Sequence, residues 1–422
     1  MTPLTSKWPT KSLAELGARV TSGSRGWASY YADHGSLFVR ITNLNRNNIY
    51  LDLTDSRFVD VDQQDAEAIR TRLAPGDILI SITADIGIVG YVDEAVPSPA
   101  YINQHIARVR LNPELANSRF VAYYLSSWGP QRKFVGATDT GAKAGMNLTT
   151  VASLTTVAPP LEEQDRIAEV LTDVDRLIAA QKRIIAKKQA VKHGVMQQLL
   201  TGRTRLPGFS DPWVDVRLGD HVTYVKTVPL SRAQLDDASP LRYLHYGDIH
   251  THSGATFDAA RESMPRAAAH LARRAGRLEP GDLVFADASE DPVGVGKSVE
   301  IASVPSEGVV PGLHTIAARF DKSVLANGFK GYLQFIPAFR EPLLRLVAGT
   351  KVLATTRSQI SSIALPLPSA AEQKAIAVVL SNIDSEITAL CVRLAKMQDI
   401  KRGVMQELLT GRVRLPIGRE NE

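Results

Sequence analysis

The residues that come nearest to a nucleotide-binding motif are a glycine-containing run that ends in lysine and serine. Asp291-Pro-Val-Gly-Val-Gly-Lys-Ser298 imitates the end of a phosphate-binding loop. Its first position is aspartate, whereas that loop requires glycine there to bring backbone amides to the phosphate. The run therefore predicts a strand or a β-turn, and no nucleotide site.

A methyltransferase loop is the second chemical motif to consider. Adenine and cytosine-N4 methyltransferases carry Asn, Asp or Ser, then two prolines, then an aromatic residue. The nearest approach is Ala158-Pro-Pro-Leu161, which lacks both the polar first residue and the aromatic last residue. We therefore expect no catalytic residues in this chain.

Histidine and cysteine provide no strong metal motif. The nine histidines are scattered, and the grouping His245, His250 and His252 has no acidic or thiolate ligands at a fixed spacing. A metal site there is the less favoured alternative to polar residues in a loop. The single cysteine, Cys391, cannot form an intramolecular disulfide or a cysteine-rich zinc site. We expect no bound metal and no cofactor.

Composition places the chain among ordinary globular proteins. Its 422 residues, 44% hydrophobic and 22% charged, suffice for two or three domains. The start of the chain has no apolar signal core, and the densest apolar run is broken by Asp85, Asp93 and Glu94. We expect a cytoplasmic protein without a membrane role. The net charge of +5 is compatible with a polyanionic partner but does not require one.

The chain contains two copies of one unit. Residues 159–207 align without a gap to residues 368–416 at an offset of 209, and 26 of the 49 positions are identical. Gly194 to Pro207, GVMQQLLTGRTRLP, recurs as GVMQELLTGRVRLP. Fainter landmarks also return, among them Trp8 with Trp213, the Pro-Gly-Asp turns at 75–77 and 280–282, and His105 with His314. Residues 23–65 and 228–270 share little.

Hydrophobic patterns predict the elements. Segments such as SLFVRITNL, GDILISI and LRYLHYGDI read as strands, so each variable part is expected to be mixed α/β. Residues 161–193, extendable to 201, contain no glycine or proline before Gly194 and repeat apolar residues at helical spacing. Residues 370–410 repeat this pattern. Each stretch predicts one long helix, and two such stripes can bury each other as a coiled coil.

This arrangement resembles the specificity subunit of type I restriction-modification systems. The resemblance is carried by the repeated helices, which open with PPLEEQ and PSAAEQ and close with the TGR-x-RLP sequences, and it covers the whole chain. It implies an α+β fold with a pseudo-two-fold internal repeat, in which two mixed α/β target-recognition domains are joined by two long helices that form an antiparallel coiled coil. The expected segments are recognition domains 1–158 and 208–367 and spacer helices 159–207 and 368–422.

Candidate DNA-contacting residues lie in the divergent segments. Asn and Arg suit the hydrogen-bonding edges of adenine and guanine, and polar residues follow an expected strand in both copies. The base-reading candidates are Asn43, Asn45, Arg46, His250, His252 and Lys297. Ordinary turn chemistry is the alternative interpretation for each of them. The phosphate candidates precede the helices and are Lys143, Lys351 and Arg357.

The closely matched helix ends indicate a surface for partner proteins. The candidate docking residues are Arg203, Arg205, Arg412 and Arg414. Basic residues from Lys182 to Arg205 are either such a functional stripe or simply the solvated face of a helix. Glu163-Gln164 and Glu372-Gln373 are expected in the first helical turn, where acids favour the positive end of the helix dipole.

The functional expectation is a non-catalytic subunit that reads a split, asymmetric DNA site. The resemblance implies double-stranded DNA, two adenine-N6 methyltransferase subunits and restriction subunits as partners, with S-adenosylmethionine, ATP and Mg on those partners. Two alternatives remain: a coiled-coil scaffold unrelated to DNA, and the specificity part of a fused restriction-methylation enzyme.

Overall fold

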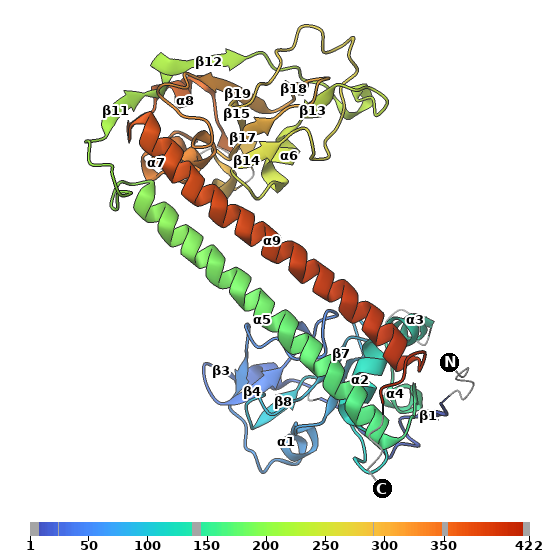
Figure 1. Ribbon diagram of the computed structural model, residues 1–422. Helices are drawn as coiled ribbons and strands as arrows, with labels where there is room; N and C mark the ends of the chain where they lie inside the picture. The colour runs from blue at the N-terminus through green and yellow to red at the C-terminus, as the bar shows by residue number, and fades with distance from the viewer. Residues whose placement is uncertain (1–7, 24, 137–144, 290, 348–352, 417–422) are drawn as a thin grey trace. The chain divides into compact units, whose positions relative to one another are not determined.

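The computed structural model describes residues 8–23, 25–136, 145–289, 291–347 and 353–416, and the chain divides into two compact units (Figure 1). Unit 1 comprises residues 1–182 and 392–422, and unit 2 comprises residues 183–391. Two long helices, α5 (Leu161–Leu199) and α9 (Ala370–Leu409), each contribute residues to both units. The two expected helices are confirmed to within two residues at their ends.

Unit 1 contains two four-stranded sheets. One is antiparallel, in the order β2-β9-β6-β7, and the other has the order β3-β5-β4-β8 with β4 and β8 parallel. A separate antiparallel pair joins β1, the first strand, to β10, the last strand before α5. The elements before α5 are β1 (Thr10–Ser12), β2 (Arg19–Ser22), η1 (Trp27–Tyr30), β3 (Tyr31–Ala32), β4 (Ser36–Val39), η2 (Ile41–Asn43), β5 (Phe58–Val59), α1 (Ala66–Thr71), β6 (Ile78–Ser81), β7 (Val89–Tyr91), β8 (Ala100–Ile102), β9 (Ile106–Arg110), α2 (Ser118–Ser126), α3 (Trp128–Gly136), α4 (Leu148–Ser153) and β10 (Thr155–Val157).

Unit 2 repeats this plan. Its five-stranded sheet has the order β12-β19-β15-β17-β14, and β13 pairs with β18 in parallel as β4 does with β8. The pair β11-β21 takes the place of β1-β10. The elements are β11 (Val214–Arg217), η3 (Leu218–His221), β12 (Val222–Val225), η4 (Arg232–Gln234), β13 (Arg242–Leu244), α6 (Tyr246–Thr251), β14 (Thr256–Asp258), β15 (Leu283–Ala286), β16 (Ala288–Ser289), η5 (Pro292–Gly294), β17 (Ser298–Ser303), β18 (Val309–Pro311), β19 (Thr315–Phe320), η6 (Lys330–Phe335), α7 (Pro337–Val347), β20 (Leu353–Ala354), α8 (Arg357–Ser362) and β21 (Ala364–Leu367).

The Pro-Gly-Asp turns hold each main sheet together. Gly76 and Gly281 have φ of 91° and 92°, a left-handed conformation that a side chain disfavours. The aspartate that follows is buried, and it receives two hydrogen bonds from an arginine on the neighbouring strand. Asp77 pairs with Arg110 at 2.7 Å, and Asp282 pairs with Arg319 at 2.7–2.8 Å. The motif is therefore structural in both copies.

The helices run antiparallel in both units. In unit 1, Ile167 and Leu171 of α5 share a core with Leu408 of α9, near the C-terminal end of that helix. In unit 2, Leu199 near the end of α5 shares a core with Ile376 and Leu380 near the start of α9. Burying one apolar stripe against the other supplies the stability that isolated helices lack.

Two sequence expectations about individual elements are wrong. LRYLHYGDI is a strand only at Arg242–Leu244 and continues as helix α6. The helix starts there because the Asp248 carboxylate accepts the His245 N–H and His245 Nδ1 accepts the Gly247 N–H, which satisfies backbone donors at the helix start. Likewise, SLFVRITNL is a strand only at Ser36–Val39 and then turns into η2.

Within the described residues, one helix, α9, contains a long apolar stretch. By length and composition alone this helix could cross a membrane, with a mean hydropathy of 1.6 in its most apolar window. Its residues Asp384 and Glu386 instead form ion pairs with Lys192 and Lys188 of α5. Only 17% of that window is buried, so the pairing of α9 with α5 covers a small part of its apolar pattern.

Candidate functional site

The polar loop of the first copy begins with a buried residue. Asn43 ends η2, and its Nδ2 donates to the carbonyls of Asp52 at 2.8 Å and Asp55 at 3.2 Å. Its Oδ1 accepts the Arg40 N–H at 2.9 Å. Both amide hydrogens are thus used inside the loop, and a DNA contact by Asn43 stays a prediction.

The next two candidates differ in their roles. Asn45 shapes the turn, because its Oδ1 accepts the N–H groups of Asn47 and Asn48 and its Nδ2 donates to the Tyr50 carbonyl. Arg46 is exposed, and its guanidinium donates to Asp85 at 2.5 Å and to Gln131 at 2.8 Å. Of the two, Arg46 presents its charged group at the surface, where a nucleic acid can compete for it.

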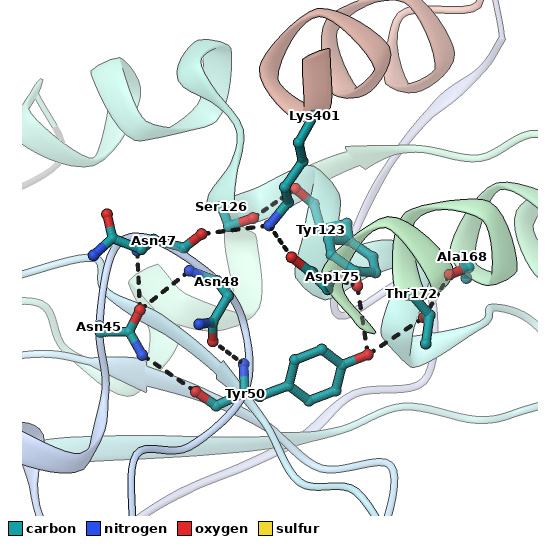
Figure 2. A network of polar contacts seen from close by, with 10 residues as sticks. All are labelled: Asn45, Asn47, Asn48, Tyr50, Tyr123, Ser126, Ala168, Thr172, Asp175 and Lys401. Carbon is teal, nitrogen blue, oxygen red and sulfur yellow. Dashed lines mark hydrogen bonds and ion pairs between the residues drawn. The ribbon is translucent and has the colours of Figure 1, made fainter. Parts of the chain in front are cut away.

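The same loop is attached to both long helices (Figure 2). Lys401 of α9 donates from Nζ to the Asn47 carbonyl at 3.3 Å and pairs with Asp175 of α5 at 2.6 Å. The Tyr50 hydroxyl donates to Thr172 of α5 at 3.3 Å. Residue types alone gave no reason to expect that a lysine 354 positions from Asn47 supports this loop.

The candidates of the second copy meet at α6. His250 Nε2 lies 2.9 Å from the Ala288 carbonyl oxygen, and the Lys297 ammonium donates to the His250 carbonyl. His252 contacts the Thr256 carbonyl and the Glu262 carboxylate, at 2.7 and 3.1 Å. Burial lowers the pKa of Lys297. The structure brings His250 and Lys297 together, but their DNA contacts stay predictions.

A cluster of rings beside α6 was not assigned a role from the sequence. The Tyr246 ring centroid lies 4.3 Å from that of His245, 6.0 Å from that of His250 and 5.5 Å from that of His314. His314 also contacts Asp287 at 3.1 Å, while burial lowers the pKa of His245. The recurrence of His105 as His314 was the available signal. The described residues contain no group of three or more His, Cys, Asp or Glu that could hold a metal.

The phosphate candidates Lys143 and Lys351 lie outside the described residues, but the chain segments that follow them are described. Gly145 forms a β-bridge with Thr83, and Ala354 pairs with Ala288 at the equivalent place. Arg357 is exposed at the start of α8, 5.4 Å above the Tyr224 ring. The described residues that follow both basic segments thus pair with the chain just beyond the end of β6 and of β15.

The helix-end arginines fall into two kinds in both copies. Arg205 donates to the buried Glu372 carboxylate through two bonds of 2.6 Å, and Arg414 lies 3.6 Å from the buried Glu163. Each of these arginines also lies over a tryptophan, Trp213 or Trp8 respectively. Arg203 and Arg412 are exposed, and Arg412 lies 3.6 Å from the accessible carboxylate of Glu407. The sequence-predicted docking set therefore divides into two internal arginines and two surface arginines.

The glutamate-glutamine dipeptides, Glu163-Gln164 and Glu372-Gln373, make equivalent contacts at the starts of α5 and α9. Gln164 donates to the Pro159 carbonyl and accepts the Asn117 N–H, while Gln373 donates to the Pro368 carbonyl and accepts the Ala326 N–H. Each glutamine thus joins the start of a long helix to its own variable segment. The adjacent glutamate pairs with the arginine that follows the other long helix: Glu163 with Arg414, and Glu372 with Arg205.

The basic stripe of α5 is partly neutralised by α9. Lys188 and Lys192 pair with Glu386 and Asp384, and Arg205 pairs with Glu372. Lys182, Arg183 and Lys187 are exposed. Helix pairing accounts for part of the charge run, and solvated lysines and arginine make up the remainder.

One apolar stripe of α5 remains uncovered. Leu177, Ile184 and Val191, spaced seven residues apart, are 59%, 47% and 47% exposed. The apolar pattern of residues 161–201 includes these positions together with Leu171, Ile178 and Ile185, but only the latter three are buried. Because each set recurs every seven residues, each stays on one face of α5, and the two sets lie on different faces.

Comparison with known proteins gives matches of one class. Residues 61–188 match the model of the type I restriction modification DNA specificity domain. Two Methanocaldococcus jannaschii proteins named as type I restriction enzyme specificity subunits, MjaX and MjaVIII, are each 24% identical. The first match covers 90% of this chain and 88% of the relative, and the second covers 61% of each.

Solved structures share the fold. The S subunit of a type I restriction-modification system from M. genitalium aligns with a TM-score of 0.60 at 11% identity, over 97% of this chain and 98% of that one. A chain from a structure describing complex assembly and conformational transition of the type I R-M system aligns at 0.57 and 16% identity, over 98% and 100%. With the repeated helices and the two similar units, these matches give residues 61–188 the DNA specificity domain, and the chain as a whole is similar in sequence and fold to type I restriction-modification specificity subunits.

Proposed function

We propose that this specificity subunit reads a split, asymmetric DNA site, with each variable segment reading one half and the two long helices setting the distance between the halves. The observation that carries the proposal is selective divergence. The contacts at the helix ends recur in both copies, whereas the first polar loop follows η2 and its counterpart is helix α6. The same helix contacts combined with different loops suit two modules that each recognise their own DNA sequence.

The proposed recognition domains are residues 1–158 and 208–367, and the proposed spacer segments are residues 159–207 and 368–422. Two similar modules held at a fixed separation suit two major-groove segments about one helical turn, roughly 34 Å, apart. The net charge of each module is close to zero, which is compatible with DNA binding because only the surface that faces the groove must be positive.

The proposed partners are double-stranded DNA, two adenine-N6 methyltransferase subunits and, in the larger complex, restriction subunits. The exposed Leu177, Ile184 and Val191 stripe and the surface arginines Arg203 and Arg412 support a protein-binding role of the helices. We propose that the chain itself is non-catalytic and cytoplasmic, and that S-adenosylmethionine, ATP and Mg bind to the partners.

A module exchange tests the proposal. Residues 8–158 are replaced with the corresponding region of a relative, and the methylated motif is mapped by long-read sequencing of host DNA. We expect only one half of the motif to change, because the helices and the second module are untouched.

The unmodified chain and a deletion of the chain are the controls. Deletion must abolish the motif, since without a specificity subunit the methyltransferase has no target. An exchange that alters both halves would contradict independent reading, and a motif that survives deletion would contradict the function itself.

A further inference from the structure

The feature that calls for an explanation is the buried lysine of α9 beneath the first polar loop. Lys401 is 6% exposed, and its ammonium contacts the Asp175 carboxylate, the Asn47 carbonyl and the face of the Tyr123 ring, whose centroid is 5.8 Å away (Figure 2). Burying a charge is costly unless it is paired and hydrogen-bonded. These three contacts meet that requirement.

The Lys401–Asp175 ion pair has all its partners on three helices, α5, α9 and α2, and needs no contribution from the loop. Asp175 accepts from Lys401 through Oδ1 and from the Tyr123 hydroxyl through Oδ2 at 2.8 Å, and burial raises the pKa of Tyr123. The bond from Lys401 to Asn47 is therefore additional to the ion pair. It joins the helices to the polar loop.

The loop also has supports that do not involve the long helices, since Arg46, next to Asn47, donates to Asp85 and Gln131. Asn45 holds the turn from inside by accepting the Asn47 and Asn48 N–H groups. Farther along, Tyr50 is fixed by its hydroxyl to Thr172 and by a β-bridge to Tyr91. Lys401 and Tyr50 thus attach the loop to the helices at two points, on either side of Asn48.

The second copy has the ion pair without the loop contact. Lys192 pairs with Asp384, which accepts from the Tyr332 hydroxyl at 3.0 Å. Within the described part of the chain, no hydrogen bond is found from Lys192 to residues 245–253. The chain therefore supplies a comparison, with an equivalent ion pair in both units and a loop contact in one; the pair of the second copy is partly exposed, with 17% and 26% of the Lys192 and Asp384 side chains accessible.

We propose that Lys401 is a positioning residue for specificity, holding the Asn45–Tyr50 loop of the first copy in the conformation that reads DNA. This inference rests on the proposed function. It assigns part of the recognition of the first half-site to a helix encoded at the opposite end of the gene. It also makes the two halves of the site differ in their dependence on the helices.

The test compares Lys401→Met with Lys192→Met in the full-length chain. Each substitution removes the ammonium of an ion pair between the two long helices and leaves an aspartate with a tyrosine partner. Backbone hydrogen exchange without DNA is measured on peptides covering residues 45–50. We expect exchange to rise about tenfold in Lys401→Met, as loss of a bond from a charged donor implies, and to stay near the unmodified rate in Lys192→Met. Lys401→Arg keeps a cation and donors, and should retain slow exchange.

The second readout is the methylated motif in host cells. Lys401→Met should relax the first half-site and leave the second half and the spacer unchanged, whereas Lys192→Met should relax neither half. If Lys401→Met does not fold, Tyr50→Phe tests the other attachment, since it removes the hydroxyl but keeps the ion pair. It should likewise speed exchange in the loop and relax the first half.

Each contrary result has a distinct meaning. Equal effects of Lys401→Met and Lys192→Met, or unchanged exchange in residues 45–50, would overturn the positioning role and leave the DNA-reading function standing. Faster exchange with an unaltered motif would also overturn it, because the loop would then not read DNA. A host motif that is independent of the whole chain would contradict the proposed function instead.

Discussion

At the scale of single residues, the polar loops contain both residues that build the loop and residues that face solvent. Asn43 and Asn45 use their side chains to satisfy nearby backbone groups, as turn-forming asparagines do. Arg46 extends to the surface. Composition could not separate these roles, because asparagine has the same donors and acceptors for a backbone as for a base.

Arg46 gives the clearest base-contact prediction. We expect Arg46→Ala to relax one base position of the first half-site by about 1–3 kcal/mol, the discrimination that a good arginine contact supplies. Binding to variant DNA sites at constant salt measures it. Arg57→Ala, which removes an exposed charge outside the polar loop, is the control. Equal losses for all sequences would make Arg46 a phosphate contact.

A second residue-scale prediction separates the helix-end arginines. Arg205→Ala leaves the buried Glu372 carboxylate without its cation, so it should lower the stability of the chain. Arg203→Ala, two residues earlier, removes an exposed charge and should leave stability unchanged while weakening assembly with the methyltransferase. Thermal unfolding and co-purification measure the two effects. Similar destabilisation by both substitutions would contradict the division between internal and surface arginines.

At the scale of elements, the two long helices are the most closely repeated part of the chain. Contacts such as Asp175 with Lys401 and Asp384 with Lys192 align α5 and α9 in opposite directions within their own units. Because the buried positions recur with heptad spacing, any change in helix length must keep that spacing and must be matched on the partner helix.

This requirement gives an element-scale prediction about spacing. Seven residues are inserted into α5 after Lys182 and seven into α9 after Cys391, where the chain passes from one unit to the other. The helices should lengthen by about 10 Å, and the spacer of the methylated motif should grow by about three base pairs. Insertion into α5 alone, the control, should abolish methylation by misaligning the seam. An unchanged spacer with both insertions would contradict the ruler role.

At the scale of the whole molecule, the electrostatic attraction to DNA must come from local surfaces, because the net charge is only +5. The basic segments before α4 and α8 are the proposed contributors. Their following residues, Gly145 and Ala354, pair with equivalent strand ends in the two units.

Salt dependence tests those segments. Lys143→Ala and Lys351→Ala should each weaken binding to all DNA sequences alike and lower the slope of log affinity against log salt by about one. Fluorescence titration at several salt concentrations measures this. Lys322→Ala, an exposed lysine elsewhere in the second copy, should leave the slope unchanged. A sequence-dependent loss at Lys143 or Lys351 would indicate base reading instead.

Much of the architecture was predictable because it depends on periodic patterns. The gapless repeat and the apolar spacing of residues 161–201 and 370–410 implied two equivalent helices, and α5 and α9 have nearly those ends. Elements shaped by local capping were less predictable. The strand expected at 241–249 ends at Leu244, because the His245 and Asp248 side chains start a helix.

The sequence by itself determined the repeat, the long helices and the family resemblance, because hydrophobic spacing and repeated motifs are properties of residue order. Only the tertiary structure decided which polar groups meet. Lys401 reaches the Asn47 loop, Arg205 reaches Glu372, and Leu177 is left exposed although it shares the apolar spacing of the seam. Such contacts join residues that are far apart in the chain, and they depend on the register and rotation of packed helices, which residue order does not specify locally.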